Sequence, residues 1–274
     1  MDNIQDIDAY VKSMSTTLFD KCWWLDKITP EINTIVDYGC AQGDLEIFID
    51  RIYPGRFKYI GIDNSPEMLA LASHNHHLHF AKPDSEFYAQ LSGVAQKCDT
   101  SKTILVLNSV MHEIFSYLTE AEQKALFSEM FGAGFAYIAI RDMYIPELEE
   151  APFDMEASFK SILCSSYAGM WNEFNHYLNN NPRSSGWWDS IALRMAEFLM
   201  KYRYVGNWQR EMKETYFWPW LPMISSLSSE SRAYKIAFTN RFYIPFIRDR
   251  VSQDFGIDFQ VETHKKVLLC EATR

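Results

Sequence analysis

The sequence predicts an α/β fold: a doubly wound, mostly parallel seven-stranded sheet with a terminal antiparallel hairpin, a helical insertion and an N-terminal helical cap. Three observations predict it. Short β-rich runs alternate with helical runs from residue 31 to residue 146, and the strand pattern returns after residue 235. The run Thr103–Asn108 is dominated by apolar residues, which indicates a strand covered on both faces. Strands that alternate with helices form parallel sheets with right-handed crossovers.

The elements are expected in a regular order along the chain. Apolar residues at helical spacing predict a helical N-terminus that Pro30 ends. Strands are expected at Thr34–Asp37, Lys58–Ile62, Leu78–Ala81, Thr103–Asn108 and Phe135–Ile140. Helices are expected at Leu45–Tyr53, at Pro66–Ser73 with Ser65 as its N-cap, at Glu120–Phe131, and at Ile244–Phe255, which Gly256 ends. The expected terminal hairpin consists of Asp258–Val261 and Lys266–Glu271.

Three parts are expected: a cap of residues 1–30, an α/β core of residues 31–146 and 235–274, and a helical, aromatic-rich insertion of residues 147–234. The insertion holds most of the chain's tryptophans, namely Trp171, Trp187, Trp188, Trp208, Trp218 and Trp220. These side chains either form the core of a small helical subdomain or line an apolar pocket, and we expect most of them to form the core. Tyr10, Trp23 and Trp24 of the cap can close over such a pocket as a lid.

Charge and composition oppose several classes of protein. The 26 Lys and Arg residues against 36 Asp and Glu residues give a net charge of −10 at pH 7, which opposes a general nucleic-acid binder. Five cysteines without a Cys-x-x-Cys pair oppose a disulfide framework and a zinc site, and they fit a reducing compartment. No run reaches the ~18 apolar residues of a membrane span, and the acidic start differs from a signal peptide. We therefore expect a soluble, cytoplasmic protein without a membrane partner.

Four histidines crowd one short stretch, namely His74, His76, His77 and His79. A metal site is one interpretation of such a cluster. The stretch leads into the expected third strand, however, and no cysteine or carboxylate stands at ligand spacing beside it. We therefore expect a solvated loop there and no metal site.

The strongest functional signal is the run Thr34–Gly43, in which a strand leads through a glycine-bearing turn into a helix. Gly39 and Gly43 permit positive φ and a close approach of the backbone to a ligand. Asp63 follows at the end of the second strand. An acid at that point accepts hydrogen bonds from ribose hydroxyls, and the ligand of such a sheet lies beyond the carboxyl ends of the strands, where the strand order reverses.

The turn does not fit a dinucleotide. The dinucleotide fingerprint needs three glycines, and this chain offers Gly39, Ala41 and Asp44 at those positions. A carboxylate at the start of the helix repels a pyrophosphate. It tolerates a cofactor that has no phosphate and carries a positive centre, and S-adenosylmethionine is such a molecule.

Three motifs in order carry a family resemblance: Asp37-Tyr38-Gly39-Cys40-Ala41-Gln42-Gly43, Gly61-Ile62-Asp63-Asn64-Ser65 and Asn108-Ser109-Val110-Met111-His112-Glu113. Over roughly residues 30–145 the chain resembles the class I (Rossmann-like) S-adenosylmethionine-dependent methyltransferases. The resemblance implies that Asp37, Gly39 and Gly43 hold the methionine portion of the cofactor. It also implies that Asp63 and Asn64 hold the ribose and the adenine edge, and that Asp84 meets the adenine amino group. The expected cofactor-binding set is Asp37, Gly39, Cys40, Gly43, Asp63, Asn64, Asp84, Asn108 and Ser109, with Cys40 as a small residue beside the turn rather than a nucleophile.

His112, Glu113 and Asp142 are the expected catalytic residues. Methyl transfer is an in-line displacement, for which alignment supplies most of the rate, and a base helps where the acceptor carries a proton. His112 falls just past the fourth strand and Asp142 just past the fifth, so a His–Asp pair there can orient the imidazole. The alternative is that His112 or Glu113 caps the following helix or contacts the methionine amino group.

The function expected from these features is transfer of a methyl group from S-adenosylmethionine to an oxygen or nitrogen atom of a small, partly aromatic or apolar acceptor. A first alternative is a methyltransferase of RNA or of a nucleotide end, in which aromatic side chains stack on bases and Arg183, Arg203 and Arg210 meet phosphates. A second alternative is a protein that binds S-adenosylmethionine without catalysis. The sequence leaves the oligomeric state open.

Overall fold

The computed structural model describes residues 17–79, 85–145, 153–181, 190–216, 234–242, 244–259 and 265–273. These residues form two compact units. The sheet unit comprises the described residues of Ile7–Asp142, Pro219–Asn240 and Val267–Arg274, and the helical unit comprises those of Met143–Trp218 and Arg241–Lys266. Every predicted catalytic or cofactor-binding residue that the structure describes belongs to the sheet unit.

The sheet unit is built on a seven-stranded sheet with the strand order β3-β2-β1-β4-β5-β7-β6. The strands are β1 (Thr34–Tyr38), β2 (Lys58–Ile62), β3 (Ser85–Tyr88), β4 (Thr103–Asn108), β5 (Tyr137–Met143), β6 (Tyr234–Phe242) and β7 (Lys265–Ala272). Neighbours among β1 to β5 pair in parallel, with Asp37 of β1 opposite Gly61 of β2 and Val106 of β4. The order therefore reverses between β1 and β4, which is where doubly wound sheets bind their ligands. The predicted fold class is confirmed.

The last two strands run antiparallel, as predicted, although not as a hairpin. Lys235 Nζ of β6 pairs with Glu271 of β7 at 3.1 Å. Thr239 Oγ1 of β6 donates a hydrogen bond to Val267 O of β7, also at 3.1 Å. Residue numbers therefore rise along one strand as they fall along the other. A helix separates the two strands in the chain, and β7 lies between β5 and β6.

Two predicted strands are wrong. Leu78 of the predicted Leu78–Ala81 lies in a helix, and the third strand is β3, whose residues are all half-buried. In the predicted Asp258–Val261, the two residues that the structure describes, Asp258 and Phe259, lie in no strand, and the sixth strand is β6. Both true strands are edges of the sheet. They bury little and therefore lack the apolar pattern that marks a strand in a sequence.

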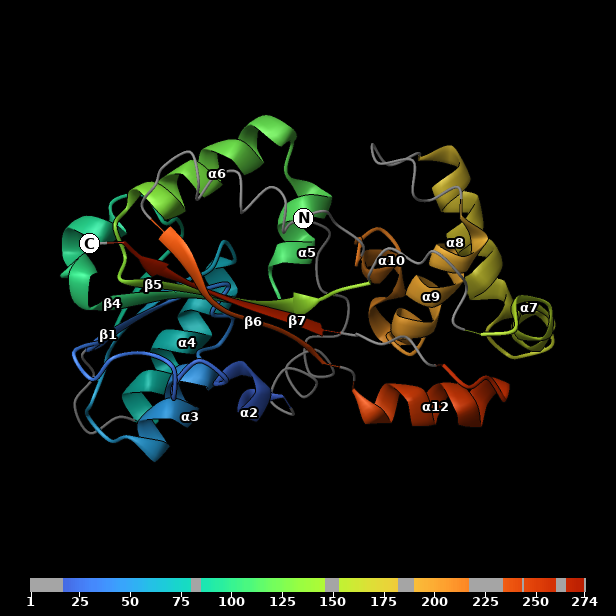
Figure 1. Cartoon of the computed structure of the whole chain (residues 1–274), viewed down its shortest axis with the longest axis horizontal. Helices are drawn as coiled ribbons and strands as arrows, with labels where there is room; N and C mark the ends of the chain where they lie inside the picture. Colours follow the sequence, from blue (N-terminus) through green and yellow to red (C-terminus); the bar gives the residue numbers. More distant parts are fainter. Residues whose placement is uncertain are drawn as a thin grey trace. The chain divides into compact units, whose positions relative to one another are not determined.

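Helices cover both faces of this sheet (Figure 1). On one face lie α5 (Met111–Tyr117) and α6 (Glu120–Gly132), and on the other α2 (Leu18–Lys21), α3 (Asp44–Ile52) and α4 (Pro66–His79). Two 3-10 turns, η1 (Val94–Lys97) and η2 (Thr100–Lys102), precede β4. The helices predicted at Leu45–Tyr53, Pro66–Ser73 and Glu120–Phe131 are confirmed as α3, α4 and α6. A capping box of Thr119 and Glu122 starts α6, because each residue satisfies a backbone amide of the other.

Helix α4 is longer than predicted because its buried side continues into the histidine stretch. Met68, Ala72 and His76 recur every four residues and are buried. His76 Nδ1 lies 2.7 Å from Ser85 Oγ, which links α4 to β3. The predicted solvated loop is therefore wrong: the stretch is helical as far as His79, and His76 belongs to the core.

The prediction of a helix that continues to Pro30 is wrong, because the helix described within the predicted N-terminal cap is short. It ends at Lys21, and the amides of Cys22 and Leu25 then bond to carbonyls three residues earlier, which makes turns. These turns bury Trp24 completely in the core between β1, α3 and the neighbouring strands. Residues 1–16, with Tyr10, lie outside the described residues.

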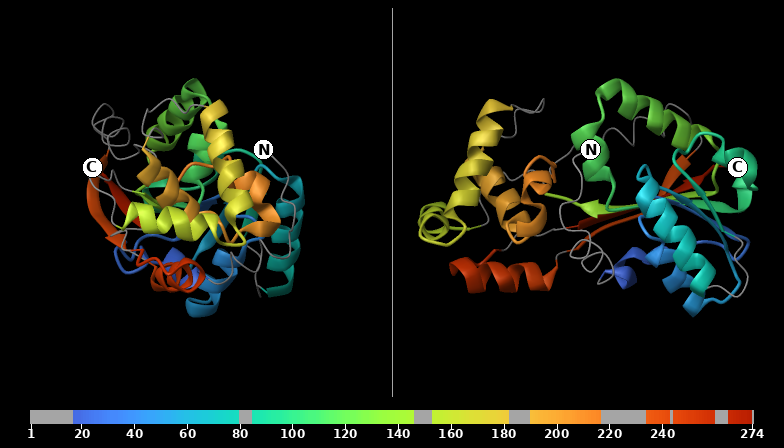
Figure 2. Two further views of the ribbon diagram at one scale, coloured as in Figure 1. Left: turned by 90° about the vertical axis from the view of Figure 1, so that its right-hand side faces the viewer. Right: turned by 180° about the vertical axis from the view of Figure 1, so that it is seen from behind.

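The helical unit contains α7 (Met155–Leu163), α8 (Ala168–Asn180), α9 (Ile191–Lys201), η4 (Val205–Asn207), α10 (Trp208–Glu211) and α12 (Pro245–Phe255) (Figure 2). Its core is aromatic: Trp171, Phe174, Phe198 and Trp208 are buried with their rings in contact. Trp171 and Trp208 therefore form core rather than pocket wall. The remaining tryptophans of the predicted insertion lie outside the described residues, namely Trp187, Trp188, Trp218 and Trp220. None of the helices that the structure describes is long and apolar enough to cross a membrane.

Two helix ends in the helical unit depend on particular residues. Gly256 ends α12 with a left-handed φ of 68°, at the predicted position. Lys201 Nζ donates to Glu197 Oε1 at 2.6 Å and to the carbonyls of Glu211 and Glu214 at 2.8 and 2.7 Å. Both side chains of the Lys201–Glu197 pair are fully buried. The lysine thereby satisfies carbonyls near the end of α10 that lack a partner within the helix.

Candidate functional site

A glycine-bearing loop joins β1 to α3 at the carboxyl edge of the sheet. Gly39 and Gly43 have φ of 81°, and Ala41 between them has φ of 47°. The amides of Gly39 and Cys40 donate to Ile62 O at 2.7 and 3.0 Å, which fastens the loop to the end of β2. The loop therefore follows a left-handed path that glycine adopts freely and alanine adopts only under strain.

Asp63, just after β2, holds this loop. Its Oδ2 accepts a hydrogen bond from the Ala41 amide at 3.0 Å, and its Oδ1 accepts one from the Ser65 amide at 2.9 Å. One carboxylate thus fixes both the strained Ala41 and the turn that starts α4. A carboxylate oxygen can accept more than one hydrogen bond, which is the capacity that binding of a ribose hydroxyl requires. Asn64, the next residue, is exposed.

Packing requires glycine at both ends of the loop. A Cβ on Gly39 would lie 3.1 Å from Val110 Cγ2, and a Cβ on Gly43 would lie 2.9 Å from His76 Nε2. Helix α4 therefore supports the loop with its buried histidine. A side chain at either glycine would displace the loop or the helix behind it.

Cys40 fills space beside the loop. It is buried, and burial raises the pKa of its thiol well above the usual value, with the nearby Glu46 and Asp37 carboxyls adding to the effect. A Cβ on Gly61 would lie 2.8 Å from Cys40 Sγ. The protonated thiol thus packs against that glycine of β2, in a setting that does not favour a nucleophile.

A second strained residue, Ser109, follows β4 with φ of 59°. Its amide donates to Arg141 O at 2.7 Å, and Arg141 Nη1 donates to Ser109 Oγ at 3.1 Å. Ser109 and Ala41 are the two non-glycine residues with positive φ in the described part of the chain. Both lie at the carboxyl edge of the sheet, and backbone strain held by specific bonds gathers at functional sites. The preceding residue, Asn108, is buried.

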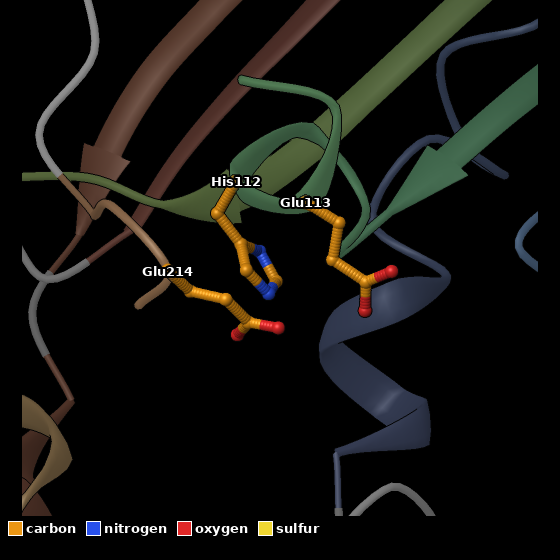
Figure 3. A group of neighbouring side chains, drawn as sticks. All are labelled: His112, Glu113 and Glu214. Carbon is orange, nitrogen blue, oxygen red and sulfur yellow. The ribbon is translucent and has the colours of Figure 1, made fainter. Parts of the chain in front are cut away.

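His112 and Asp142 form a hydrogen-bonded pair across the ends of β4 and β5. Asp142 Oδ1 lies 2.7 Å from His112 Nδ1, and Asp142 Oδ2 accepts a hydrogen bond from the His112 amide at 3.0 Å. Asp142 is fully buried, and His112 is buried in the first turn of α5. Because the carboxylate accepts from Nδ1, it holds the proton there and leaves Nε2 as the basic nitrogen. Figure 3 shows His112 and the half-buried Glu113 next to each other on α5.

Three titratable side chains are buried around the loop: Lys21 of α2, Asp37 of β1 and Glu46 of α3. Burial raises the pKa of Asp37 to about 7, an effect that Lys21 opposes and Asp63 reinforces. Burial also raises the pKa of Glu46 well above its usual value, and Asp37 raises it further. Burial lowers the pKa of Lys21 to about 8, and Arg141 lowers it further. Asp37 Oδ1 and both Glu46 oxygens have no hydrogen-bond partner among the described residues.

The buried Glu46 carboxyl predicts a pH-dependent stability. Because its pKa is raised in the folded chain, the folded state keeps a proton that the unfolded chain loses above about 4.5. The free energy of unfolding therefore falls as the pH rises from that value toward the raised pKa. Glu46→Gln removes this dependence. We expect the Tm of the variant to exceed that of the unchanged chain by a margin that grows roughly a few degrees between pH 5 and pH 8.

Differential scanning calorimetry at several pH values measures this margin. The exposed Glu67, in the first turn of α4, provides the control Glu67→Gln. Its Tm difference from the unchanged chain should stay constant with pH. A constant difference for Glu46→Gln as well would show that the buried carboxyl does not hold a proton in the folded state.

Sequence patterns did not single out Lys21, Glu46 or Arg141. Arg141 is fully buried in β5, and its Nη2 donates to Asp20 Oδ2 of α2 at 3.2 Å. A signal for this residue was present, because Arg141 and Asp142 stand together at the end of an otherwise apolar strand. Glu46 gave no signal, since an acid in the first turn of a helix is usually an exposed residue that favours the helix start.

Four more residues were predicted to contact a ligand. Asp84, the expected adenine contact, and Arg183 lie outside the described residues. Arg203 and Arg210 of the helical unit each form an ion pair with a carboxylate, at 2.6 and 2.8 Å. Their charges are therefore already balanced, which weakens the attraction that they offer to phosphates.

A pocket of about 380 Å³ opens along α3, and its lining comes from α2, α3, α4 and the loop before α3: Leu18, Gln42, Asp44, Ile47, Phe48, Arg51 and Asn75. Gln42 Nε2 donates to Asp44 Oδ2 at 2.9 Å in its wall. Among the described residues, none of the predicted cofactor-binding set lines this pocket. The pocket nevertheless meets the glycine-bearing loop at Gln42 and the start of α3 at Asp44.

No protein-family model matches the chain, and no curated protein matches it. Among solved structures, it is similar to the methyltransferase domain of bacterial CtHen1, with 11% identity, 93% of this chain and 96% of that chain covered, and a TM-score of 0.49. It is similar to the plantazolicin methyltransferase BamL in complex with a triazolic desmethylPZN analogue and SAH, with 10% identity, 95% and 84% covered, and a TM-score of 0.47. It is also similar to Haemonchus contortus phosphoethanolamine N-methyltransferase 2 in complex with S-adenosyl-L-methionine, with 11% identity, 95% and 57% covered, and a TM-score of 0.46. The fold assignment rests on the strand order and register of the sheet itself.

Proposed function

We propose that the chain is an S-adenosylmethionine-dependent methyltransferase that transfers a methyl group to an oxygen or nitrogen atom of a small, partly aromatic or apolar acceptor. The observation that carries the proposal is the hydrogen-bonded His112–Asp142 pair at the same sheet edge as the strained, glycine-bearing loop. A cofactor loop at the end of β1 and a histidine oriented by a buried carboxylate at the ends of β4 and β5 would then share one edge of the sheet.

The residues at this edge suit the chemistry of S-adenosylmethionine, which carries an ammonium, a sulfonium and ribose hydroxyls but no phosphate. Asp37 Oδ1 and Asn108 Oδ1 are buried acceptors without a partner in the described part of the chain, which suits the donors of an ammonium. Asp44 at the start of α3 opposes a pyrophosphate. We assign Asp37 and Asn108 to the methionine portion, and Asp63 with Asn64 to the ribose. The backbone around the cofactor is shaped by Gly39, Cys40, Gly43 and Ser109.

In the proposed reaction, the bound cofactor supplies a methyl group that its sulfonium activates for displacement. His112 Nε2 removes the proton from the acceptor's hydroxyl or amine. Asp142 Oδ2 accepts from the His112 amide and Oδ1 from Nδ1, so the carboxylate fixes the ring orientation and, in the neutral ring, the tautomer with its proton on Nδ1. Glu113, the next residue on α5, is the third proposed catalytic residue, as an acidic group that holds the acceptor.

Calorimetric titration with S-adenosylmethionine, S-adenosylhomocysteine, NADH and ATP tests the cofactor assignment. We expect the first two to bind and the other two not to bind, because the loop lacks the third glycine and presents Asp44 to a pyrophosphate. Binding of NADH or ATP with no binding of S-adenosylmethionine would overturn the proposal.

Transfer of a labelled methyl group separates the proposed reaction from its alternatives. Label in a small-molecule fraction of a cell extract supports the proposal. Label in RNA, together with RNA binding that weakens steeply as salt is added, supports the RNA alternative. Cofactor binding without transfer to any fraction supports a protein that only binds the cofactor.

A further inference from the structure

One side of helix α3 carries a regular distribution of charge. Asp44, Ile47, Phe48 and Arg51 recur at steps of three and four residues, so they lie along one face of the helix, which we call the α3 face. All four line the pocket of about 380 Å³. The carboxylate stands at the start of the helix, the guanidinium in its last turn, and the two apolar side chains between them. The α3 face therefore has a negative end, an apolar middle and a positive end.

An exposed phenylalanine stands beside this pocket. Phe19 belongs to α2, which contacts α3 (Figure 1), and it is 82% exposed, more than any other large apolar side chain of the described residues. Its ring meets the Phe48 ring edge to face, with the centroids 5.5 Å apart. Phe48 and Leu18 line the pocket. An apolar projection thus stands next to a partly apolar hollow, and exposed apolar surface gathered in this way marks an interaction site.

Both charged ends of the α3 face can take a partner. Arg51 is exposed and forms no ion pair with the residues that the structure describes. Asp44 uses Oδ2 for the hydrogen bond from Gln42 Nε2 at 2.9 Å, and its other carboxylate oxygen is a further acceptor. Each end can therefore pair with a charge of the opposite sign.

The α3 face is complementary to itself. The midpoint between Asp44 and Arg51 in the chain falls between Ile47 and Phe48. A two-fold axis that lies in the interface at this midpoint, perpendicular to α3, sets two copies of the helix antiparallel and places each Asp44 opposite Arg51 of the second copy. Such an axis also keeps the α2 side of one copy against the α2 side of the other. Phe19 therefore meets the Leu18 and Phe48 side of the second copy's pocket.

We propose that the α3 face, together with Phe19, joins two copies of the chain in a two-fold dimer. Self-complementary contacts of this kind are typical of homodimers. Exposed ion pairs contribute little attraction, so burial of the two Phe19 rings supplies the affinity, and the two Asp44–Arg51 pairs set the orientation. The net charge of −10 on each chain opposes association, but salt screens charges more than about 8 Å apart, whereas the paired charges are in contact. The inference does not depend on the proposed function.

Sedimentation equilibrium over a series of protein concentrations tests the inference. We expect the unchanged chain to reach twice its chain mass of 32.1 kDa. Phe19→Ser should raise the dissociation constant of the dimer about tenfold or more, because it removes the ring that the second copy buries. Phe246→Ser is the matched control, at a phenylalanine that is 55% exposed on α12 of the helical unit. It should leave the dissociation constant unchanged.

Two charge reversals test the orientation of the copies. Asp44→Lys and Arg51→Glu each place like charges opposite one another at both ends of the interface, so each variant alone should be monomeric where the unchanged chain is dimeric. An equimolar mixture of the two variants should form dimers, because one chain then presents two cations on the α3 face and the other presents two anions. The double variant Asp44→Lys/Arg51→Glu should be dimeric again. If Asp44→Lys does not fold, Arg51→Glu and Phe19→Ser still test the surface.

Three results would overturn the inference without affecting the proposed function. A chain that stays monomeric at every concentration would leave the pocket to some other occupant. A dimer that neither Phe19→Ser nor Arg51→Glu weakens would join its copies through another surface. A mixture of two folded charge variants that stays monomeric would exclude the antiparallel pairing of the two helices.

Discussion

Replacing Asp63 by alanine is expected to weaken the binding of S-adenosylmethionine by about 30- to 1000-fold. The change removes the 3.0 Å hydrogen bond from the Ala41 amide and the 2.9 Å hydrogen bond from the Ser65 amide. It also removes the acceptor proposed for the ribose hydroxyls. Charge-assisted hydrogen bonds of this kind contribute about 2–4 kcal/mol together. Titration calorimetry measures the loss, and amide hydrogen exchange at Ala41 reports whether the loop has loosened.

Asp50→Ala is the matched control for this experiment. Asp50 Oδ1 also accepts a backbone hydrogen bond, from the Gly55 amide at 3.0 Å, but in an exposed turn beyond the end of α3. Its replacement should leave cofactor affinity within about twofold. Undiminished affinity in Asp63→Ala would contradict the assignment of the whole cofactor site, since Asp63 holds the Ala41 amide, whereas the Cys40 thiol bonds only to the Ala41 carbonyl, at 3.6 Å.

Replacing Asp142 by asparagine is expected to lower kcat about 100-fold or more while the Kd for S-adenosylmethionine stays nearly unchanged. A carboxylate accepts hydrogen bonds from both the His112 amide and Nδ1, whereas an asparagine side chain has only one acceptor oxygen. The backbone amide of His112 can only donate, so the asparagine oxygen would accept from it and the asparagine NH₂ group would face Nδ1. Because the NH₂ group donates, Nδ1 would then have to accept, which favours the tautomer with its proton on Nε2. His112→Ala removes the base and should cost a factor of about 10²–10⁴.

Nitrogen-15 NMR of labelled histidine tests the tautomer without knowledge of the acceptor. We expect the His112 proton on Nδ1 in the unchanged chain and on Nε2 in Asp142→Asn. Transfer of labelled methyl groups then measures kcat, with His74→Ala as the control because His74 is exposed on α4. A His112→Ala variant with unchanged kcat would remove the histidine from the mechanism.

The central strands could be predicted from the sequence because burial on both faces leaves a simple pattern. Every residue of β4 and of β5 is buried, and their apolar runs are visible in the sequence. The edge strands could not be predicted in this way, because most residues of β6 are exposed and all residues of β3 are only half-buried. The hydrophobic effect gives such strands little sequence signal, and only pairing with a neighbour defines them.

Residues of the candidate site could be predicted from the sequence where a local motif or a strand end specifies their position. The positive φ at Gly39 and Gly43 follows from the glycines of the motif itself. The pairing of His112 with Asp142 follows because the ends of parallel strands meet at one edge of the sheet. Lys21 was not predictable in this way. Its position depends on bonds to residues far along the chain, of which Asn108 is one. No spacing rule links a lysine near the start of a chain to a strand end formed so much later.

The order of synthesis differs from the order of the sheet. β7 lies between β5 and β6, yet it is the last of the seven strands to be made. On the ribosome, β5 therefore keeps an open edge, and β6 has no neighbour in the sheet, until β7 emerges. An open strand edge invites pairing with another chain. A nascent chain can therefore complete its sheet only after β7 is translated. A chain that stops before β7 would leave the edge of β5 unpaired and open to pairing with other chains.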